Sequence, residues 1–144
     1  MSESECREVL ELMVDDELTS KILQACFEVS NELGAGFLES VYEKALVVAL
    51  AQKGLKVTAQ VPLKVKFRNV IVGEYFADLI VEDRVLIELK AVSRILPEHK
   101  AQVINYLTAT GVELGLLVNF GMPRIEYYRL HARQQHPVHP LHPV

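Results

Sequence analysis

Three charged residues interrupt two otherwise apolar stretches near the middle of the chain, GEYFADLIV and RVLIELKA. Asp78 stands in the first stretch, whereas Glu88 and Lys90 stand in the second. A three-residue loop between the stretches would pair Val81 with Val85. Asp78 then falls opposite Glu88, and Lys90 shares the face of Glu88 because side chains alternate along a strand with a period of two. The spacing therefore predicts that two carboxylates and one ammonium group converge on one surface of a sheet.

These charges favour a site for a divalent cation. Like charges that face each other across an antiparallel pair destabilise it, and a hard cation held by a few carboxylate oxygens relieves the repulsion. A second interpretation is a solvated polar face in which Lys90 neutralises one acid. The run VLIEL is apolar on both faces except at Glu88, which indicates a strand covered on both sides. A carboxylate in that position needs a partner.

The elements that must position these residues follow from the hydrophobic pattern. We expect one helix from a cap at Asp15 or Asp16 to the break GAG, and a second helix that ends at Gly54. The period then changes to two, and VPLKVKF, VIVGEYFADLIV and RVLIELKA are expected to form an antiparallel meander. A helix from Pro97 to Gly111 and two short strands, ELGLLVNFG and RIEYYRLH, follow. We predict an α/β fold with a central mixed β-sheet flanked by α-helices.

Length and composition favour a single domain without a membrane segment. The chain has 144 residues, half of them hydrophobic, and its longest apolar run, ALVVALA, has seven residues. Two cysteines, Cys6 and Cys26, make no disulfide framework, so we expect a reducing, cytoplasmic location. We divide the chain into an N-terminal extension (1–14), one folded domain (15–131) and a His/Pro-rich tail (132–144). We expect the tail to be disordered and place it outside the site, although its histidines could also bind zinc or nickel.

The charged residues carry a resemblance to a known superfamily. Asp78, followed by Glu88-Leu89-Lys90, resembles the D…(E/D)xK core of the PD-(D/E)XK nuclease superfamily, in which the acids bind metal and the lysine serves the attacking water. Ala77 stands where the superfamily name has proline. That position is neither a metal ligand nor an acid–base group, so the departure leaves the proposed chemistry intact.

Two further motifs extend the resemblance over about residues 17–130. Gly36, Glu39 and Tyr42 in GFLESVYEKAL match the signature of the GxxExxY family, a group similar to that superfamily. Gln102 and Tyr106 in AQVINYLTATG resemble the QxxxY motif of RecB-type exonucleases. The resemblance implies a PD-(D/E)XK nuclease-like fold and hydrolysis of phosphodiester bonds in nucleic acid, with DNA as the expected substrate.

The resemblance also implies roles for the core residues. Asp78, Glu88 and the main-chain carbonyl of Leu89 would hold Mg²⁺ or Mn²⁺, and Lys90 would position or deprotonate the attacking water. Glu39 would add a catalytic acid or orient that water. Its second interpretation is a helix-start acid, favoured by the helix dipole.

The remaining motif residues are expected to contact the substrate. Tyr42 falls in the apolar arc of its helix, which favours the core, although its hydroxyl could reach the edge of the site. Gln102 and Tyr106 lie on a helix face opposite Val103 and Leu107, which predicts exposure to solvent for both. Within the resemblance, the pair would contact the nucleic-acid backbone, and Tyr106 could stack on a base of a single strand.

A binding or scaffolding protein on the same fold is the rival interpretation. The net charge is −4, with 15 Lys plus Arg against 19 Asp plus Glu, so no global basic field attracts nucleic acid. The basic residues are dispersed along the sequence, without aromatic interleaving: Lys64, Lys66, Arg68, Arg84, Arg94, Lys100 and Arg124. Such a protein would keep the acids as a structural cluster and act through a protein partner or a homodimer.

Overall fold

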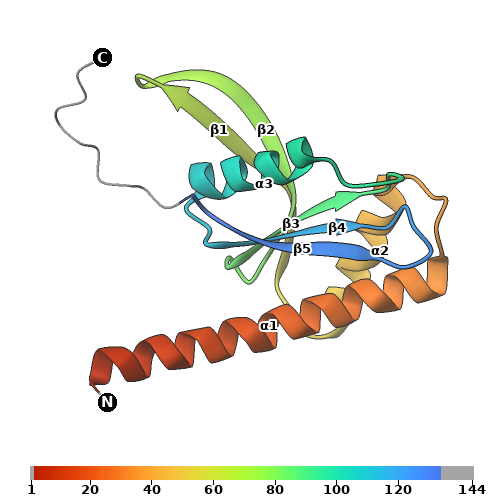
Figure 1. Ribbon diagram of the computed structural model, residues 1–144, viewed down its shortest axis with the longest axis horizontal. Helices are drawn as coiled ribbons and strands as arrows, with labels where there is room; N and C mark the ends of the chain where they lie inside the picture. The colour runs from red at the N-terminus through yellow and green to blue at the C-terminus, as the bar shows by residue number, and fades with distance from the viewer. Residues whose placement is uncertain (1, 134–144) are drawn as a thin grey trace.

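The computed structural model describes residues 2–133 and shows three helices around a five-stranded sheet (Figure 1). The helices are α1 (Glu3–Leu33), α2 (Glu39–Gln52) and α3 (Pro97–Thr110). The strands are β1 (Val57–Phe67), β2 (Val70–Val81), β3 (Val85–Lys90), β4 (Leu114–Asn119) and β5 (Glu126–His131). This order of elements is the predicted one. The tail for which we predict disorder lies, from residue 134 on, outside the described residues.

The strands form one mixed sheet in the order β1-β2-β3-β4-β5. β3 and β4 are parallel, and every other neighbouring pair is antiparallel. Parallel neighbours need a crossover connection, and α3 supplies it between β3 and β4. Val81 pairs with Val85 across the loop of residues 82–84. The predicted meander of the first three strands and the predicted mixed sheet are confirmed.

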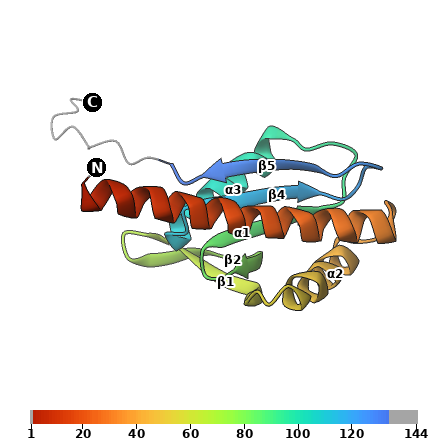
Figure 2. The same ribbon diagram turned by 90° about the horizontal axis from the view of Figure 1, so that it is seen from below.

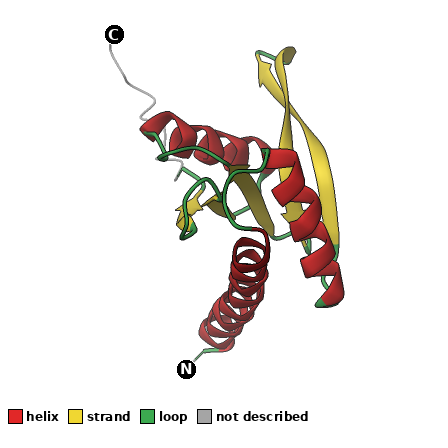
Figure 3. Ribbon diagram, turned by 90° about the vertical axis from the view of Figure 1, so that its right-hand side faces the viewer, coloured by secondary structure: helices red, strands yellow, loops and turns green. Residues whose placement is uncertain are grey.

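Helices cover both faces of the sheet. On one face α1 and α2 bury Ile22 and Leu46 against Ile87, and on the other α3 buries Leu107 against Leu86. Figure 2 shows α1 running along its face of the sheet, and Figure 3 shows α1 and α3 on opposite sides of the strands. Because side chains alternate along β3, the even-numbered positions face α3. Glu88 and Lys90 therefore belong to the α3 side.

α1 begins at Glu3, so the prediction of a helix cap at Asp15 or Asp16 is wrong. The hydroxyl of Ser2 accepts a hydrogen bond from the main-chain N–H of Glu5 at 3.2 Å, and the Glu5 carboxylate accepts one from the N–H of Ser2 at 3.2 Å. This reciprocal capping box satisfies two main-chain donors, which fixes the start of the helix there. The predicted N-terminal extension is therefore helical from Glu3 onward.

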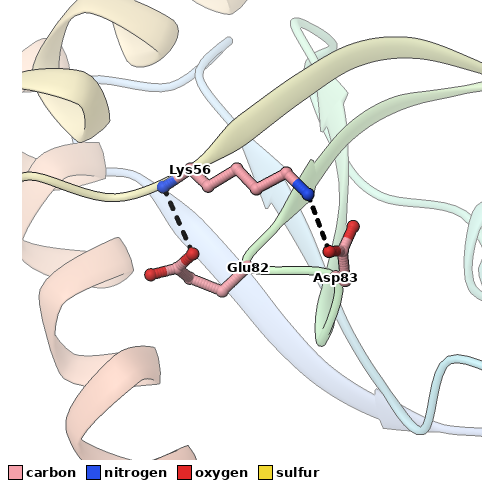
Figure 4. A network of polar contacts seen from close by, with 3 residues as sticks. All are labelled: Lys56, Glu82 and Asp83. Carbon is pink, nitrogen blue, oxygen red and sulfur yellow. Dashed lines mark hydrogen bonds and ion pairs between the residues drawn. The ribbon is translucent and has the colours of Figure 1, made fainter.

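A polar clamp holds the loop between β2 and β3 (Figure 4). The ammonium of Lys56 lies 2.9 Å from the carboxylate of Asp83, and the main-chain N–H of Lys56 donates to the Glu82 carboxylate at 3.4 Å. The N–H of Glu82 donates in return to the carbonyl of Lys56 at 2.8 Å. Glu82 and Asp83 have φ values of 52° and 55°, as a tight reversal of the chain requires. These contacts thereby fix the pairing of β2 with β3, and this pairing sets Asp78 beside Glu88.

The β1–β2 hairpin extends beyond the rest of the sheet (Figure 1). Its turn is formed by Arg68 and Asn69, with φ values of 51° and 65°, and β1 pairs with β2 up to this turn. β3 pairs only with residues 79–81 of β2. Near the turn, Val72 is an extra residue in β2, and such a bulge increases the local twist. The far part of the hairpin therefore stands apart from β3.

Candidate active site at the fork between two strands

β2 and β3 separate at Asp78, and two carboxylates lie in the fork. Main-chain pairing of the two strands ends at Leu79 and Ile87. Beyond that pair, the N–H of Asp78 donates to Oε1 of Glu88 at 3.1 Å, and the N–H of Leu89 donates to Oδ2 of Asp78 at 2.8 Å. The structure thus brings the two acids together across adjacent antiparallel strands, as the register predicted.

The strand on the other side of Asp78 is also irregular. Gln60 of β1 lies across from Asp78, between two regular pairs, and has a φ of 52°. A left-handed conformation at a residue other than glycine costs on the order of 1–3 kcal/mol and is concentrated at functional sites. The hydrogen-bond ladder is therefore irregular at Asp78 toward both neighbouring strands, β1 and β3. The carboxylate of Asp78 bonds to the main chain of β3 at this point.

Glu88 is a buried carboxylate with a strongly shifted pKa. Its side chain belongs to a residue that is 5% exposed, and burial raises its pKa to about 8, with a further contribution from the negative charge of Asp78. The nearby ammonium of Lys90 acts in the opposite direction. Burial therefore favours the protonated form of Glu88 in the metal-free pair, which relieves the charge repulsion that the sequence predicted.

Lys90 lies at the end of β3, half-buried, on the same side as Glu88. Its positive charge lowers the pKa of both Glu88 and Glu39. The carbonyl of Lys90 accepts a hydrogen bond from the N–H of Phe120 at 2.8 Å, which ties this end of β3 to β4. The predicted convergence of two carboxylates and a lysine is present.

Asn119 holds the same corner and was not singled out from the sequence. It is fully buried at the end of β4, in register with Lys90 of β3. Its Oδ1 accepts from the N–H groups of Val92 and Gly121, both at 3.0 Å, and its Nδ2 donates to the carbonyl of Val92 at 3.0 Å. Asn119 thus fastens the segment after Lys90. An amide inside the apolar run LLVNF was the signal that could have revealed it.

Glu39 lies at the rim of the cluster, in the first turn of α2. The residue is exposed overall, yet partial desolvation of its carboxylate raises its pKa, which Lys90 lowers and Asp78 raises. His99, at the start of α3, also lowers it. Glu39 therefore lies near enough to Lys90, Asp78 and His99 for their charges to act on its carboxylate, while the residue remains accessible to solvent. The orientation expected for its side chain stays a prediction.

Tyr42 is a core residue that holds the loop before Glu39. Its hydroxyl donates to the carbonyl of Gly34 at 2.6 Å and accepts from the N–H of Phe37 at 3.2 Å, and its ring stacks on Phe120 with centroids 4.8 Å apart. The residue is fully buried. The expected substrate contact is therefore not supported, because the hydroxyl bonds to the loop between α1 and α2. Tyr42 instead positions the start of α2, which carries Glu39.

Gln102 and Tyr106 face the site, so the prediction that they are exposed to solvent is wrong. Tyr106 is 7% exposed and packs with Ala77 and Leu86, and Gln102 is half-buried. The Nε2 of Gln102 donates to the Tyr106 hydroxyl at 2.7 Å. Burial raises the pKa of Tyr106, and the charges of Glu88 and Asp78 raise it further. The motif pair therefore lies beside the acids, because α3 packs across the fork.

The donor set at the fork fits a hard divalent cation. Two carboxylates meet there; one oxygen of each accepts a main-chain N–H, and the two side chains also hydrogen-bond to each other. Within residues 2–133, no three side chains of His, Cys, Asp or Glu come together closely enough to hold a metal. Mg²⁺ is commonly held by one or two carboxylates together with water and substrate phosphate, which is the ligand set available here.

The fold and this cluster define a nuclease-like α/β protein. Residues 16–130 match the family model of the PD-(D/E)XK nuclease superfamily. The chain therefore belongs to that superfamily. Ala77, which stands in place of the proline of the family name, is fully buried on the α3 side.

One solved structure shares the fold at low sequence identity, and a second one is more distantly similar. The crystal structure of SSO0001 matches with a TM-score of 0.50 and 21% identity, over 67% of this chain and 52% of that chain. An alkaline exonuclease from Laribacter hongkongensis (LHK-Exo) matches with a TM-score of 0.46 and 16% identity, over 60% of this chain and 52% of that chain. The match thus spans about half the length of each of these proteins.

Two further comparisons bear on the chain as a whole. No curated protein matches its sequence. Among the helices of the described residues, none combines the length and the apolar character that crossing a bilayer requires.

Proposed function

We propose that the protein hydrolyses phosphodiester bonds in nucleic acid at the fork between β2 and β3, with Mg²⁺ or Mn²⁺ as cofactor. The observation that carries the proposal is the junction of Asp78 and Glu88, each bonded to the main chain of the other strand, with Lys90 beside them. Membership of the PD-(D/E)XK nuclease superfamily supports this chemistry. DNA is the substrate that we expect.

We assign each residue of the site a role according to its position. Asp78 and Glu88, with the main-chain carbonyl of Leu89, would hold the cation. A bound divalent cation stabilises negative charge on the scissile phosphate and lowers the pKa of water. Lys90 lies on the same side of β3 as Glu88, where its ammonium would orient the attacking water, or its neutral amine would take the proton of that water. Glu39, exposed at the rim, would orient the same water from the opposite side.

This arrangement suggests why Gly36, Glu39 and Tyr42 of the GxxExxY pattern occur together. Gly36 has a φ of 112°, which favours glycine, and Tyr42 binds the same loop through its hydroxyl. Together they would set the start of α2 so that Glu39 meets Lys90. We infer that the pattern serves the geometry of one acid rather than three separate contacts with substrate.

We also retain the proposal of a reducing compartment. Cys26 is buried, and this burial raises the pKa of its thiol to about 12, so it behaves as a small hydrophobic side chain. Cys6 is exposed on α1. Neither cysteine is in a disulfide, which is the state expected in the cytoplasm.

A non-catalytic binding protein is the second candidate, and one observation favours it. Both acids are already hydrogen-bonded to the main chain, so the cluster could serve only to join β2 and β3. This candidate requires Glu88 to be anionic beside Lys90, in spite of the burial that raises its pKa, and replacing it with glutamine would then destabilise the protein at neutral pH.

The nuclease proposal and the binding-protein proposal predict different melting temperatures for Glu88→Gln in the absence of metal. If the site is built for a cation, glutamine mimics the protonated acid, and the variant unfolds at or above the wild-type temperature in EDTA at neutral pH. Addition of Mg²⁺ or Mn²⁺ then raises the melting temperature of the wild type more than that of the variant. A variant that is destabilised in EDTA, with a wild type indifferent to both cations, would leave only the binding protein.

A further inference from the structure

A groove separates the β1–β2 hairpin from α3 and leads toward the fork. Its volume is about 1090 Å³. Lys64 and Lys66 of β1 and Tyr75 of β2 form one wall, and Gln102 and Tyr106 of α3 form the other. Because Tyr106 is also buried against the neighbours of the two acids, the inner end of the groove adjoins the candidate active site.

Positive charge gathers along this groove, although the chain as a whole is acidic. Lys64 and Lys66 are exposed on the hairpin wall, and Arg133 lines the groove while its guanidinium donates to Oδ1 of Asn105 at 2.9 Å. Glu98 is the one acid among the described residues that line it. Lys64 and Lys66 are two of the seven basic residues that the sequence disperses, and the fold adds Arg133 to them in this groove. Such a lining fits a polyanion that passes along the groove.

Two aromatic rings lie in the same groove. Tyr75 is 45% exposed, and its ring centroid lies 5.7 Å from that of Tyr106, with an interplanar angle of 42°. An accessible ring beside a basic wall, such as that of Tyr75, is a recognition element for an unpaired base, whose face can stack on it. In a duplex the bases are stacked on one another, so only their edges are presented in the grooves.

We propose that this groove binds a single strand of nucleic acid, with the phosphates along Lys64 and Lys66 and a base against Tyr75. The direction of the strand, toward Asp78 and Glu88, rests on the function proposed above. The binding itself does not, because the lysines and the exposed ring lie outside the metal site and act on the strand without any reaction.

Binding can be measured apart from cleavage by fluorescence anisotropy in EDTA. The probes are a short labelled oligothymidine, an oligouridine of equal length, and a labelled duplex of the same length. We expect both single strands to bind more tightly than the duplex, and the two single-stranded probes separate DNA from RNA. A plot of log affinity against log salt concentration should have a slope of about −0.7 for each phosphate neutralised on a single strand.

Two variants test the walls of the groove. Lys64→Ala/Lys66→Ala should reduce the steepness of the salt slope by roughly 1.4, because two phosphate contacts are lost. Tyr75→Ala should weaken binding of the single strands about tenfold, with less effect on the duplex. The matched control is Lys44→Ala/Arg124→Ala, which removes the same charge from two exposed positions outside the groove and should leave the salt slope unchanged.

The outcomes separate this proposal from the nuclease proposal. Equal affinity for duplex and single strand, or equal effects of the groove and control variants, overturns the groove as a single-strand site even if the protein cleaves nucleic acid. Selective single-strand binding that depends on Lys64, Lys66 and Tyr75 supports the groove even if no substrate is cut. Tight binding of an acidic peptide, with none of any oligonucleotide, also overturns it.

Discussion

The main-chain N–H of Asp78 donates a hydrogen bond to the side chain of Glu88 at 3.1 Å, where a regular sheet would use a main-chain carbonyl. The carboxylate of Asp78 in turn accepts from the N–H of Leu89 at 2.8 Å. These bonds replace the ladder between β2 and β3 beyond Leu79. The acids are therefore held in place by the strands that diverge around them, before any ligand is bound.

The shifted pKa of Glu88 predicts how metal-free stability depends on pH. The folded pKa of about 8 lies above the ordinary value of 4.5, so folding takes up a proton. The resulting stabilisation is fully present below about pH 4.5 and is lost as the pH rises through about 8, by an amount on the order of a few kcal/mol. Urea unfolding in EDTA across this range should show the fall in the wild type and a flatter profile in Glu88→Gln. Parallel profiles would contradict the assignment.

The same proton should be released when the metal binds. A cation requires the carboxylate in its anionic form, so Mg²⁺ or Mn²⁺ must displace the proton that Glu88 holds below about pH 8. Calorimetric titration in two buffers with different ionisation heats should report proton release at neutral pH and little release well above pH 8. Affinity should also rise with pH. Heats that are independent of the buffer at neutral pH would show that the cation does not bind at Glu88.

Lys90 is predicted to act in the reaction rather than in holding the metal. Lys90→Met keeps most of the side-chain length and removes the charge, so we expect nuclease activity to fall roughly 10²- to 10⁴-fold, the range for loss of a proton-transfer group. The metal-induced rise in melting temperature should persist. Lys44→Met, at an exposed position of α2, is the matched control and should keep full activity. Activity of Lys90→Met within a few-fold of wild type would remove Lys90 from the mechanism.

Tyr42→Phe tests the positioning of Glu39. The phenylalanine ring can keep its stacking on Phe120, whereas both hydrogen bonds to the loop of residues 34–37 are lost. We expect a loss of about 1–3 kcal/mol in the free energy of unfolding, measured with urea. Nuclease activity should fall further in Tyr42→Phe than in the control Tyr127→Phe, whose tyrosine is exposed. When Tyr42→Phe is added to Glu39→Gln, activity should not fall below that of Glu39→Gln alone. A stability unchanged from wild type would mean that the hydroxyl does not hold the loop.

The local pattern of the chain predicted the pairing of the acids. The periods of two in β2 and β3 and the short loop at residues 82–84 were enough to place Asp78 beside Glu88. The start of α1 was missed because the cap was placed at Asp15 or Asp16. Ser2 and Glu5 nevertheless have the spacing of a capping box, and Val9, Leu10 and Met13 continue a helical period after it. Asn119 was missed because its role depends on contacts with a segment distant in the sequence.

The features that could not be predicted depend on long-range geometry. A helical wheel placed Tyr106 opposite Val103 and Leu107, yet α3 crosses the fork so that Tyr106 is buried as well. Lys64 and Arg133 are far apart in the sequence, and they meet in one groove only because the hairpin extends beyond β3 beside α3. No pattern along the chain indicates how far β2 stays paired with β1 after it leaves β3.

The most direct test is cleavage of a labelled single-stranded DNA by the purified protein in the presence of Mg²⁺ or Mn²⁺. Wild type, Glu88→Gln, Asp78→Asn and the exposed control Glu74→Gln would be compared, each with and without EDTA. We predict cleavage by the wild type and by Glu74→Gln that EDTA abolishes, and no cleavage by either fork variant although both remain folded. Cleavage that survives Glu88→Gln and Asp78→Asn at the wild-type rate, or that does not depend on the cation, would contradict a metal-dependent nuclease site at the fork.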